Sequence, residues 1–297
     1  MIAVHLIEAL YGCIQSAKLW FSTIKNMLLN LDFVQNLQDA CVFNQGQTTI
    51  GLYVDDLIIT AQEEGAINSL LQQLVKHFKR IEVNRGTCHD YLGMRLLFCH
   101  EDRSVKISMS GYIQSLISDN NIRRTSSFPA VPDILKMSQQ DEVLLSPAMQ
   151  QSLHSTVARI QYLASRSRPD IQFVTSHLAS RVNKFVASDQ TKVTKLLEYL
   201  AGTIEKGITL HIPDTSSISM KLYADASFAI HQLSRSHSGG CLSLGSGSIA
   251  WKSKKQTLTT ISTSESELVA LSDMSALLFH MEKFLTIVGM TSSFLHI

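Results

Sequence analysis

The sequence lacks the features that would place it in a membrane, in an oxidising compartment or on a strongly charged partner. Its longest apolar runs fall far short of the roughly 20 residues that a membrane-spanning helix needs. The 5 cysteines form no Cys-x-x-Cys pair and no amino-terminal signal pattern is present, so we expect reduced, buried cysteines of an intracellular protein. Lysine and arginine total 26 against 25 for aspartate and glutamate, and a net charge of +1 confines any nucleic-acid-binding surface to local patches.

Neither a low-complexity segment nor an internal repeat interrupts the chain. A length of 297 residues predicts two domains with a connecting segment.

Residues 47–61, QTTIGLYVDDLIITA, predict a β-hairpin with two carboxylates at its tip. Consecutive side chains of a strand point to opposite faces, so Asp55 and Asp56 can converge on one ligand only where the backbone turns. Aspartate also favours turns by itself, and the pattern alone leaves a plain turn as the alternative. One face of the hairpin is expected to carry Ile50, Leu52 and Val54, with Tyr53 and Asp55 on the other.

Around this hairpin the apolar spacing predicts one helix from about Ala17 to Asn30 and a second over 67–78. Residues 89–98, HDYLGMRLLF, predict a strand with a central glycine. A further strand at 105–109 leads into a short helix, and the two prolines of TSSFPAVPD then break regular structure at a subdomain boundary.

The second half of the chain predicts helices first and a sheet later. One helix covers 153–163, a second opens at Pro169 and a third ends at Gly202. Strands at 219–227, 239–247 and 248–260, followed by a helix from about 263 to 289, predict an antiparallel meander backed by a helix. The expected domains are 1–125, 126–213 and 214–297.

The start of the last helix carries two glutamates with different expected roles. Ser262 as N-cap and Glu265 form a capping box. Glu267 falls on an apolar stripe expected to face the sheet, where a charge needs a partner or a metal, although the helix dipole also favours it there. Asp273 is expected on nearly the opposite face of the helix. The stripe comprises Leu271, Met274, Leu278, Met281 and Leu285.

The string LYVDDLIIT resembles the YxDD motif of copia-type retrotransposon reverse transcriptases. By that resemblance Asp55 and Asp56 help hold two Mg²⁺ ions that activate a primer 3′-hydroxyl and stabilise the leaving pyrophosphate. LYGCIQSAKLW is similar to the family's LYGLKQSPRLW, and HDYLGMRLLF to its YFLGIEI. These likenesses imply nucleotide or template contacts at Gly12, Ser16 and Tyr53, and primer contacts at Leu92 and Gly93.

The chain also departs from the family's pattern. Ile14 stands where the family has lysine, and Ala17 where it has proline. A further catalytic aspartate of the family lies several dozen residues upstream of LYGLKQ, and another on the strand after the last helix. We therefore expect a fragment truncated at both ends.

The carboxy-terminal region resembles a copia-type RNase H domain through YADASFA, SRSHSGGCLSLGSGSIAWKSKKQ and STSESELVAL. The resemblance implies that Asp225 and Glu267 bind metal to position water for cleavage of the RNA strand. Lys252, Lys254 and Lys255 could neutralise phosphates, with a solvated face as the alternative. Between the two regions, HSTVARIQYLASRSRPDIQFV resembles the family's helical connection. Its arginines could touch a nucleic-acid backbone, with plain solvated side chains as the alternative for each: Arg159, Arg166 and Arg168.

Together these features predict an α+β protein: part of a reverse-transcriptase palm with a helical thumb or connection, then part of an RNase H-like α/β domain. The expected cofactor is Mg²⁺, and the expected partners are an RNA template, a DNA primer, RNA/DNA hybrids, dNTPs and the rest of a Pol polyprotein, but no membrane. The expected location is intracellular, in cytoplasmic virus-like particles or the nucleus. The alternative is a catalytically dead, non-enzymatic retrotransposon remnant that at most binds nucleic acid.

Overall fold

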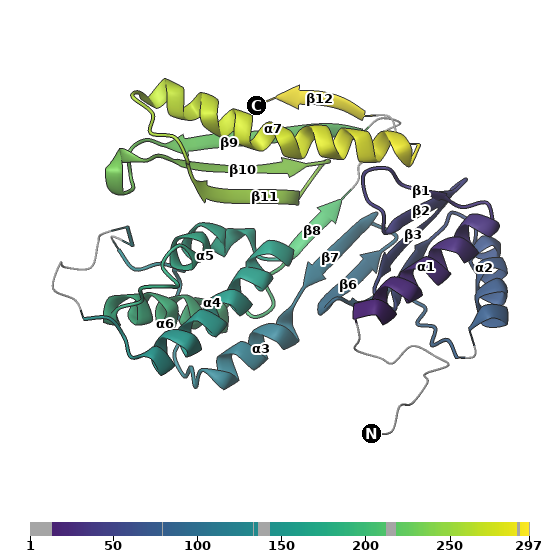
Figure 1. Cartoon of the computed structure of the whole chain (residues 1–297), viewed down its shortest axis with the longest axis horizontal. Coiled ribbons are helices and arrows are strands. Elements are labelled where there is room, and N and C mark those ends of the chain that lie inside the picture. The colour runs from purple at the N-terminus through teal and green to yellow at the C-terminus, as the bar shows by residue number, and fades with distance from the viewer. Residues whose placement is uncertain are drawn as a thin grey trace, which may run out of the picture. The chain divides into compact units, whose positions relative to one another are not determined.

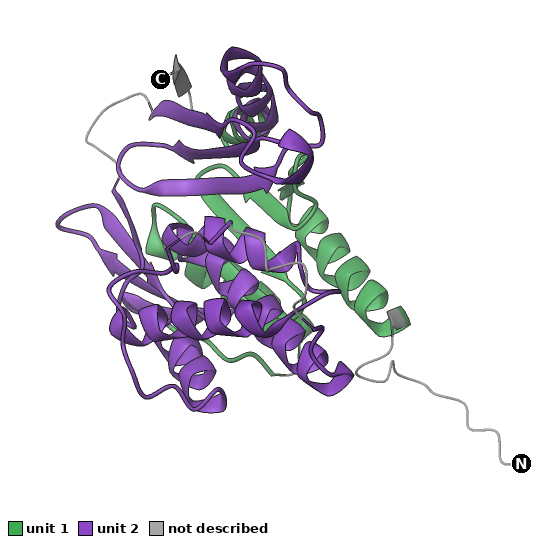
Figure 2. Cartoon of the chain, turned by 90° about the vertical axis from the view of Figure 1, so that its left-hand side faces the viewer, with its two compact units in different colours: residues 1–84, 280–291 green, residues 85–279, 292–297 purple. Residues whose placement is uncertain are grey.

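A computed structural model describes residues 14–78, 80–132, 134–135, 143–211, 218–289 and 292–296. These residues form a mixed α+β fold with seven α-helices and three four-stranded sheets. The chain divides into two compact units, shown in Figure 2: residues 1–84 with 280–291, and residues 85–279 with 292–297. The boundaries expected at 125/126 and 213/214 stay predictions.

The first unit contains an antiparallel sheet with two helices packed on it (Figure 1). Its strands, in sheet order, are β1 (Val34–Gln35), β2 (Val42–Gln45), β3 (Thr48–Tyr53) and β4 (Asp56–Thr60). Helices α1 (Ile14–Asn30) and α2 (Glu64–His77) correspond to the two predicted helices. Their apolar faces meet the sheet in a core that includes Ile24, Leu28, Phe43, Ile50 and Leu74.

The predicted hairpin is confirmed, with one error in its buried face. Ile50 and Leu52 are buried as expected, but Val54 is 56% exposed. It lies in the turn and not in a strand, so the alternation of side chains no longer applies to it.

The second unit begins with another antiparallel sheet, in the order β5 (Cys88–Tyr91), β6 (Met94–Cys99), β7 (Ser104–Ser108) and β8 (Ile208–His211). The prediction of one strand over 89–98 was wrong, because a turn at Leu92 and Gly93 divides it into β5 and β6. The φ angles of Leu92 and Gly93 are 52° and 72°, which is the left-handed conformation of a two-residue hairpin turn. Helix α3 (Ser110–Asp119) follows β7 as predicted.

Helices α4 (Pro147–Arg166), α5 (Gln172–Ala179) and α6 (Ala187–Gly202) pack with α3 around a second core (Figure 1). The hydroxyl of Ser146 caps α4 by accepting from the Met149 amide, and Pro147 occupies the first helical position. A short 3₁₀ turn, Pro169–Ile171, precedes α5, so proline opens this helix as expected. The core is built around Ile160, Leu163, Leu178, Leu196 and Leu200.

Arg168 belongs to this core and not to a surface that could touch nucleic acid. Its side chain is 0% exposed and pairs with Asp170 at 2.9 Å. It also donates to the carbonyl and the hydroxyl of Thr203 at 3.0 and 2.8 Å. The expectation of a nucleic-acid contact at Arg168 was therefore wrong.

The third sheet has the order β11-β10-β9-β12. Its strands are β9 (Ile218–Ser227), β10 (His237–Ser243), β11 (Ser248–Lys255) and β12 (Ser292–His296). The predicted meander of β9, β10 and β11 is confirmed, while β12 pairs with β9 in parallel. Helix α7 (Thr263–Ile287) lies across the meander (Figure 1), and its residues from 280 onward belong to the first unit.

The described cysteines are unpaired, as expected, but not all of them are buried. Cys41 and Cys88 are exposed, whereas Cys99 and Cys241 are partly buried. Within the described ranges, no helix is both long and apolar enough to cross a membrane.

Candidate functional site

The two aspartates of the hairpin lie where β3 turns into β4. Tyr53 pairs with Asp56 across the hairpin, which leaves Val54 and Asp55 as the two turn residues. The φ angle of Val54 is 53°, a left-handed conformation that β-branched residues rarely adopt. Such a conformation costs about 1–3 kcal/mol and persists only where the surroundings impose it.

Trp20 of α1 holds this turn in place. Its indole nitrogen donates to the Val54 carbonyl at 2.5 Å. Its ring also packs against Phe78, the residue after α2, with ring centroids 5.0 Å apart. The hairpin tip is therefore tied to both helices. Sequence analysis missed this role, although the tryptophan ends the LYGCIQSAKLW stretch.

Asp55 and Asp56 are both exposed at the tip. Among the described residues, neither carboxylate has a hydrogen-bond or ion-pair partner, so both are available to a ligand. Carboxylate oxygens suit Mg²⁺, a hard cation. No third histidine, cysteine, aspartate or glutamate of the described ranges completes a metal-binding group with them. The pair fits part of a magnesium shell, and water or groups beyond these ranges would complete it.

The other predicted contacts of this region are distributed as follows. Tyr53 is 50% exposed beside the aspartates, as a nucleotide-contacting residue must be. Ser16 lies in the first turn of α1 and is partly buried. Gly12 lies outside the described residues.

The turn at Leu92 and Gly93 is fixed by the helices of the second unit. The Tyr162 hydroxyl of α4 donates to the Leu92 carbonyl at 2.8 Å. The ring of Tyr162 lies 5.7 Å from that of Tyr112 and 5.3 Å from the Arg166 guanidinium. The exposed Arg166 guanidinium therefore lies over Tyr162, the residue whose hydroxyl binds the turn.

Asp225 is exposed near the end of β9, on the sheet face that α7 does not cover. Its neighbours Leu222 and Ala224 belong to the opposite face, where a Cβ on Gly240, the partner of Ala224, would lie 2.6 Å from Met274 of α7. The alternation around Asp225 is thus the predicted one.

Glu267 does not lie on the sheet-facing stripe of α7, and that expectation was wrong. Its side chain is exposed, as is Leu271, whereas Met274, Leu278 and Leu285 of the predicted stripe are buried as expected. The buried residues of α7 nearest to Glu267 are Ser266, Ala270 and Met274. In the described residues, no cluster of three potential ligands joins Asp225 and Glu267.

Asp273 faces the sheet instead. It binds the Lys254 ammonium at 2.6 Å and accepts from the Ser238 hydroxyl at 2.9 Å. Lys254 is therefore engaged within the protein, whereas Lys252 is exposed and Lys255 partly buried. Half of the predicted capping box is present, because the Ser262 hydroxyl accepts from the Glu265 amide. The Glu265 carboxylate accepts from the Ile261 amide and not from that of Ser262.

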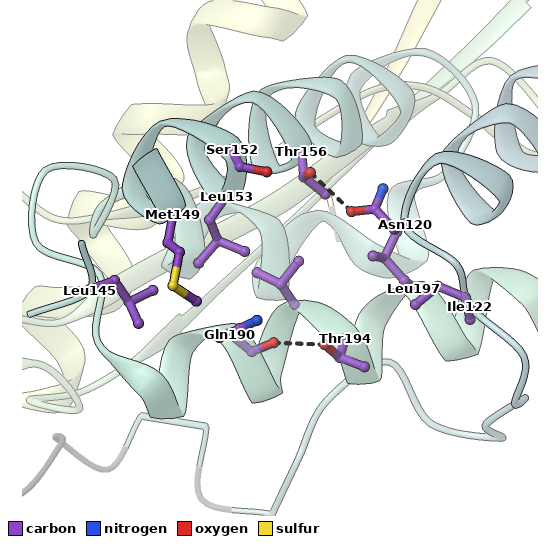
Figure 3. Close-up of a pocket in the computed structure, with 11 residues that line it drawn as sticks. Asn120, Ile122, Leu145, Met149, Ser152, Leu153, Thr156, Gln190, Thr194 and Leu197 are labelled. Carbon is purple, nitrogen blue, oxygen red and sulfur yellow. Dashed lines mark hydrogen bonds between the residues drawn. The ribbon is translucent and has the colours of Figure 1, made fainter. Parts of the chain in front are cut away.

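A small hollow of about 170 Å³ lies among the helices of the second unit. Figure 3 shows the side chains that line it. Apolar side chains such as Leu153 and Leu197 line it, together with a hydrogen bond of 3.2 Å from Thr156 to Asn120. None of its lining side chains is charged, so it offers no ionisable acid or base.

Comparison with known proteins shows which proteins the chain is similar to. Residues 3–134 match the family described as reverse transcriptase (RNA-dependent DNA polymerase). The chain is similar to the retrovirus-related Pol polyprotein from transposon RE1 of Arabidopsis thaliana, with 27% identity over 91% of the chain and 18% of the relative. It is also similar to the transposon Ty1-ER2 Gag-Pol polyprotein of Saccharomyces cerevisiae, with 26% identity over 93% of the chain and 16% of the relative.

A third relative is the retrovirus-related Pol polyprotein from transposon TNT 1-94 of Nicotiana tabacum, with 25% identity over 95% of the chain and 22% of the relative. The chain thus spans about a fifth of the length of the curated relatives it matches. The likeness runs through both units and beyond the matched reverse-transcriptase segment. The matched family and these relatives together support a copia-type reverse-transcriptase region of a retrotransposon Pol polyprotein.

Proposed function

We propose that the chain supplies the YVDD hairpin of a magnesium-dependent, RNA-templated DNA polymerase. The observation that supports this most is the strained turn at Val54, tied to Trp20, which presents two exposed carboxylates with no described partner. Asp55 and Asp56 would hold the ions, and Tyr53 would border the incoming dNTP. Bound Mg²⁺ supplies charge stabilisation at the attacking and leaving oxygens. The chain's own part is to hold the two carboxylates in one place.

The test is primer extension on an RNA template by a polyprotein segment that contains this chain. Asp55→Asn and Asp56→Asn should each slow dNTP incorporation about 100-fold or more, because a catalytic metal contributes several kcal/mol. Asp39→Asn, at another exposed aspartate of the same unit, is the matched control and should leave the rate unchanged. Equal rates for wild type and Asp55→Asn would refute the role.

The second part of the proposal is that the carboxy-terminal sheet belongs to an RNase H that cleaves RNA in hybrids. Support comes from the strand order β11-β10-β9-β12, with α7 connecting the meander to a strand parallel to β9, and from the exposure of Asp225 on the central strand β9. Asp225 and Glu267 would contribute oxygen ligands, and Lys252 would approach a phosphate.

Cleavage of a labelled RNA strand in an RNA/DNA hybrid tests this second activity in the same segment. Asp225→Asn and Glu267→Gln should abolish magnesium-dependent cleavage, while Glu101→Gln, an exposed glutamate in the same unit, should not. Cleavage that survives Asp225→Asn would exclude the assignment.

Template, primer, hybrid and the remainder of the polyprotein are the partners that this function requires, and cytoplasmic virus-like particles or the nucleus are the proposed locations. The competing candidate is a non-enzymatic remnant that binds nucleic acid. The observation in its favour is that, in the described residues, Asp225 and Glu267 have no third ligand. Loss of both activities, with retained binding of hybrid, would favour that reading.

A further inference from the structure

A second, larger pocket lies beside Asp225, between α5 and the exposed face of the third sheet. Its volume is about 520 Å³, within the range of small-molecule sites. The strand register explains which sheet residues meet there, because Tyr223, Cys241 and Trp251 are cross-strand neighbours, as are Asp225, Gly239 and Ser253. The 3₁₀ turn and α5 add Pro169, Gln172 and Phe173.

Two of the aromatic walls are held in position by other parts of the unit. The indole nitrogen of Trp251 donates to the Ala164 carbonyl of α4 at 2.9 Å. The ring of Phe173 meets the ring of His237 edge to face, with centroids 5.0 Å apart. The third wall, Tyr223, is 41% exposed and open to a ligand. Flat rings fixed in this way lose little entropy when they bind another flat ring.

Gly239 leaves the floor of the pocket open. A Cβ added to Gly239 would meet no atom within 4 Å. At the next residue, Gly240, there is no room for a side chain, since an added Cβ would lie 2.6 Å from Met274 on the α7 side of the sheet. The empty space is therefore confined to the face that carries Asp225.

The polar residues of the pocket lining are Gln172, Asp225, Lys252 and Ser253, and two of them offer hydrogen-bond acceptors. The Asp225 carboxylate is exposed there, and the side-chain oxygen Oε1 of Gln172 is buried without a hydrogen-bond partner. An unsatisfied buried acceptor is unfavourable, and a donor on a ligand would offset that cost. A ligand that suits the pocket is flat and aromatic and carries N–H donors on its edge.

Nucleobases have these properties, and aromatic side chains stack on unpaired bases without strict sequence preference. We infer that the pocket lined by Phe173, Tyr223 and Trp251 binds one unpaired nucleobase, stacked over Gly239 with its donor edge toward Asp225 and Gln172. This site goes beyond the proposed polymerase and RNase H activities, because it needs neither metal nor catalysis. Purines should bind more tightly than pyrimidines, since they offer more stacking area.

Calorimetric titration of the chain with guanosine, adenosine, cytidine and uridine 5′-monophosphates tests the site. EDTA is present throughout, so that failure to bind leaves the metal-dependent activities a separate question. Wild type should bind the purine nucleotides saturably. Gly239→Leu, whose Cβ would meet no atom within 4 Å, should weaken binding at least fivefold, as should Tyr223→Ala at an exposed wall. Gly65→Leu, where an added Cβ also meets no atom within 4 Å, is the matched control and should bind as wild type.

Three results would overturn the inference. The first is no saturable binding by wild type, and the second is unchanged binding by both Gly239→Leu and Tyr223→Ala. The third is binding of choline in place of the nucleotides, because aromatic walls beside a carboxylate also suit an organic cation. Circular dichroism of each variant establishes that it is folded. If Gly239→Leu is not, Tyr223→Ala decides the matter.

Discussion

Replacing Arg168 with methionine is expected to lower the free energy of unfolding of the second unit by about 3–5 kcal/mol. The guanidinium is fully buried and binds both oxygens of Asp170 at 2.9 Å. Removing one partner of a buried ion pair leaves the other charge uncompensated, and that loss is usually of this size. Tyr199 and Lys206 still contact the Asp170 carboxylate, at 2.8 and 3.2 Å, so the lower end of the range is the better expectation.

Urea denaturation followed by circular dichroism measures this effect. Arg166→Met, two residues earlier in the chain, is the matched control. Its guanidinium is exposed and lies over Tyr162, so we expect a change of less than about 1 kcal/mol. A loss of under 1 kcal/mol for Arg168→Met would contradict the structural role of this arginine.

Acid is expected to destabilise the second unit between pH 6.5 and about 4 through one buried and one partly buried histidine. His237 of β10 is 6% exposed, hydrogen bonded to His231 at 2.8 Å and to Ser253 at 2.7 Å. His177 of α5 is partly buried, and its Nε2 has no partner. In the folded protein each imidazole ring is therefore neutral.

Burial is the main cause that lowers the pKa of His237 to about 4, helped by His231 and His177. Burial, followed by Lys192 and Arg181, lowers the pKa of His177 to about 4 against the opposing charge of Asp189. Below pH 6.5 the unfolded chain binds protons that the folded chain does not, so the free energy of unfolding falls with falling pH until about pH 4. For one such ring the loss is roughly 3 kcal/mol.

Denaturation at pH 7.5 and 4.5 checks this dependence. His237→Gln keeps a polar side chain but removes the titration, and it should reduce the difference in stability between the two pH values. His100→Gln, at an exposed histidine, should leave that difference unchanged. An identical pH dependence in wild type and His237→Gln would show that His237 is not responsible.

The hairpin, the helices and the meander could be predicted because their apolar periods are unambiguous. The hairpin is the clearest case, since alternation on both sides of Asp55 and Asp56 leaves no other place for the turn. The strand predicted over 89–98 failed for a local reason. A glycine in an apolar run fits a bulge or a two-residue turn equally well, and the choice depends on Tyr162, 70 residues away, which binds the turn at Leu92.

The rotation of α7 about its own axis could be predicted only in part from the spacing of its apolar residues. Apolar residues such as Leu268, Leu271 and Phe279 lie on its exposed side, so hydrophobicity does not distinguish the two faces. Asp273 was expected on nearly the opposite face from Glu267, and it is. The prediction was right for Met274, Leu278 and Leu285, which are buried, and wrong for Glu267 and Leu271. Asp273 contacts the sheet through Lys254 and Ser238.

Buried polar networks and ring contacts could not be predicted from the sequence either. In the string RSRPD, Arg168 has the pattern of a surface cation. Its partner Thr203 is 35 residues away, so the sequence gives no sign of the buried contact. The role of Trp20 depends on the carbonyl of a residue 34 positions later. Such contacts have no periodic signature, and only the fold brings them together.

The most direct measurement of the hairpin's role is the position of bound metal. Mn²⁺, which prefers the same oxygen ligands as Mg²⁺, broadens nearby amide signals in a nitrogen–proton NMR spectrum. At substoichiometric Mn²⁺ the signals of residues 53–57 should disappear first, and excess Mg²⁺ or Asp55→Asn should restore them. Signals of 53–57 that persist while those of another region are lost would contradict a magnesium site at Asp55 and Asp56.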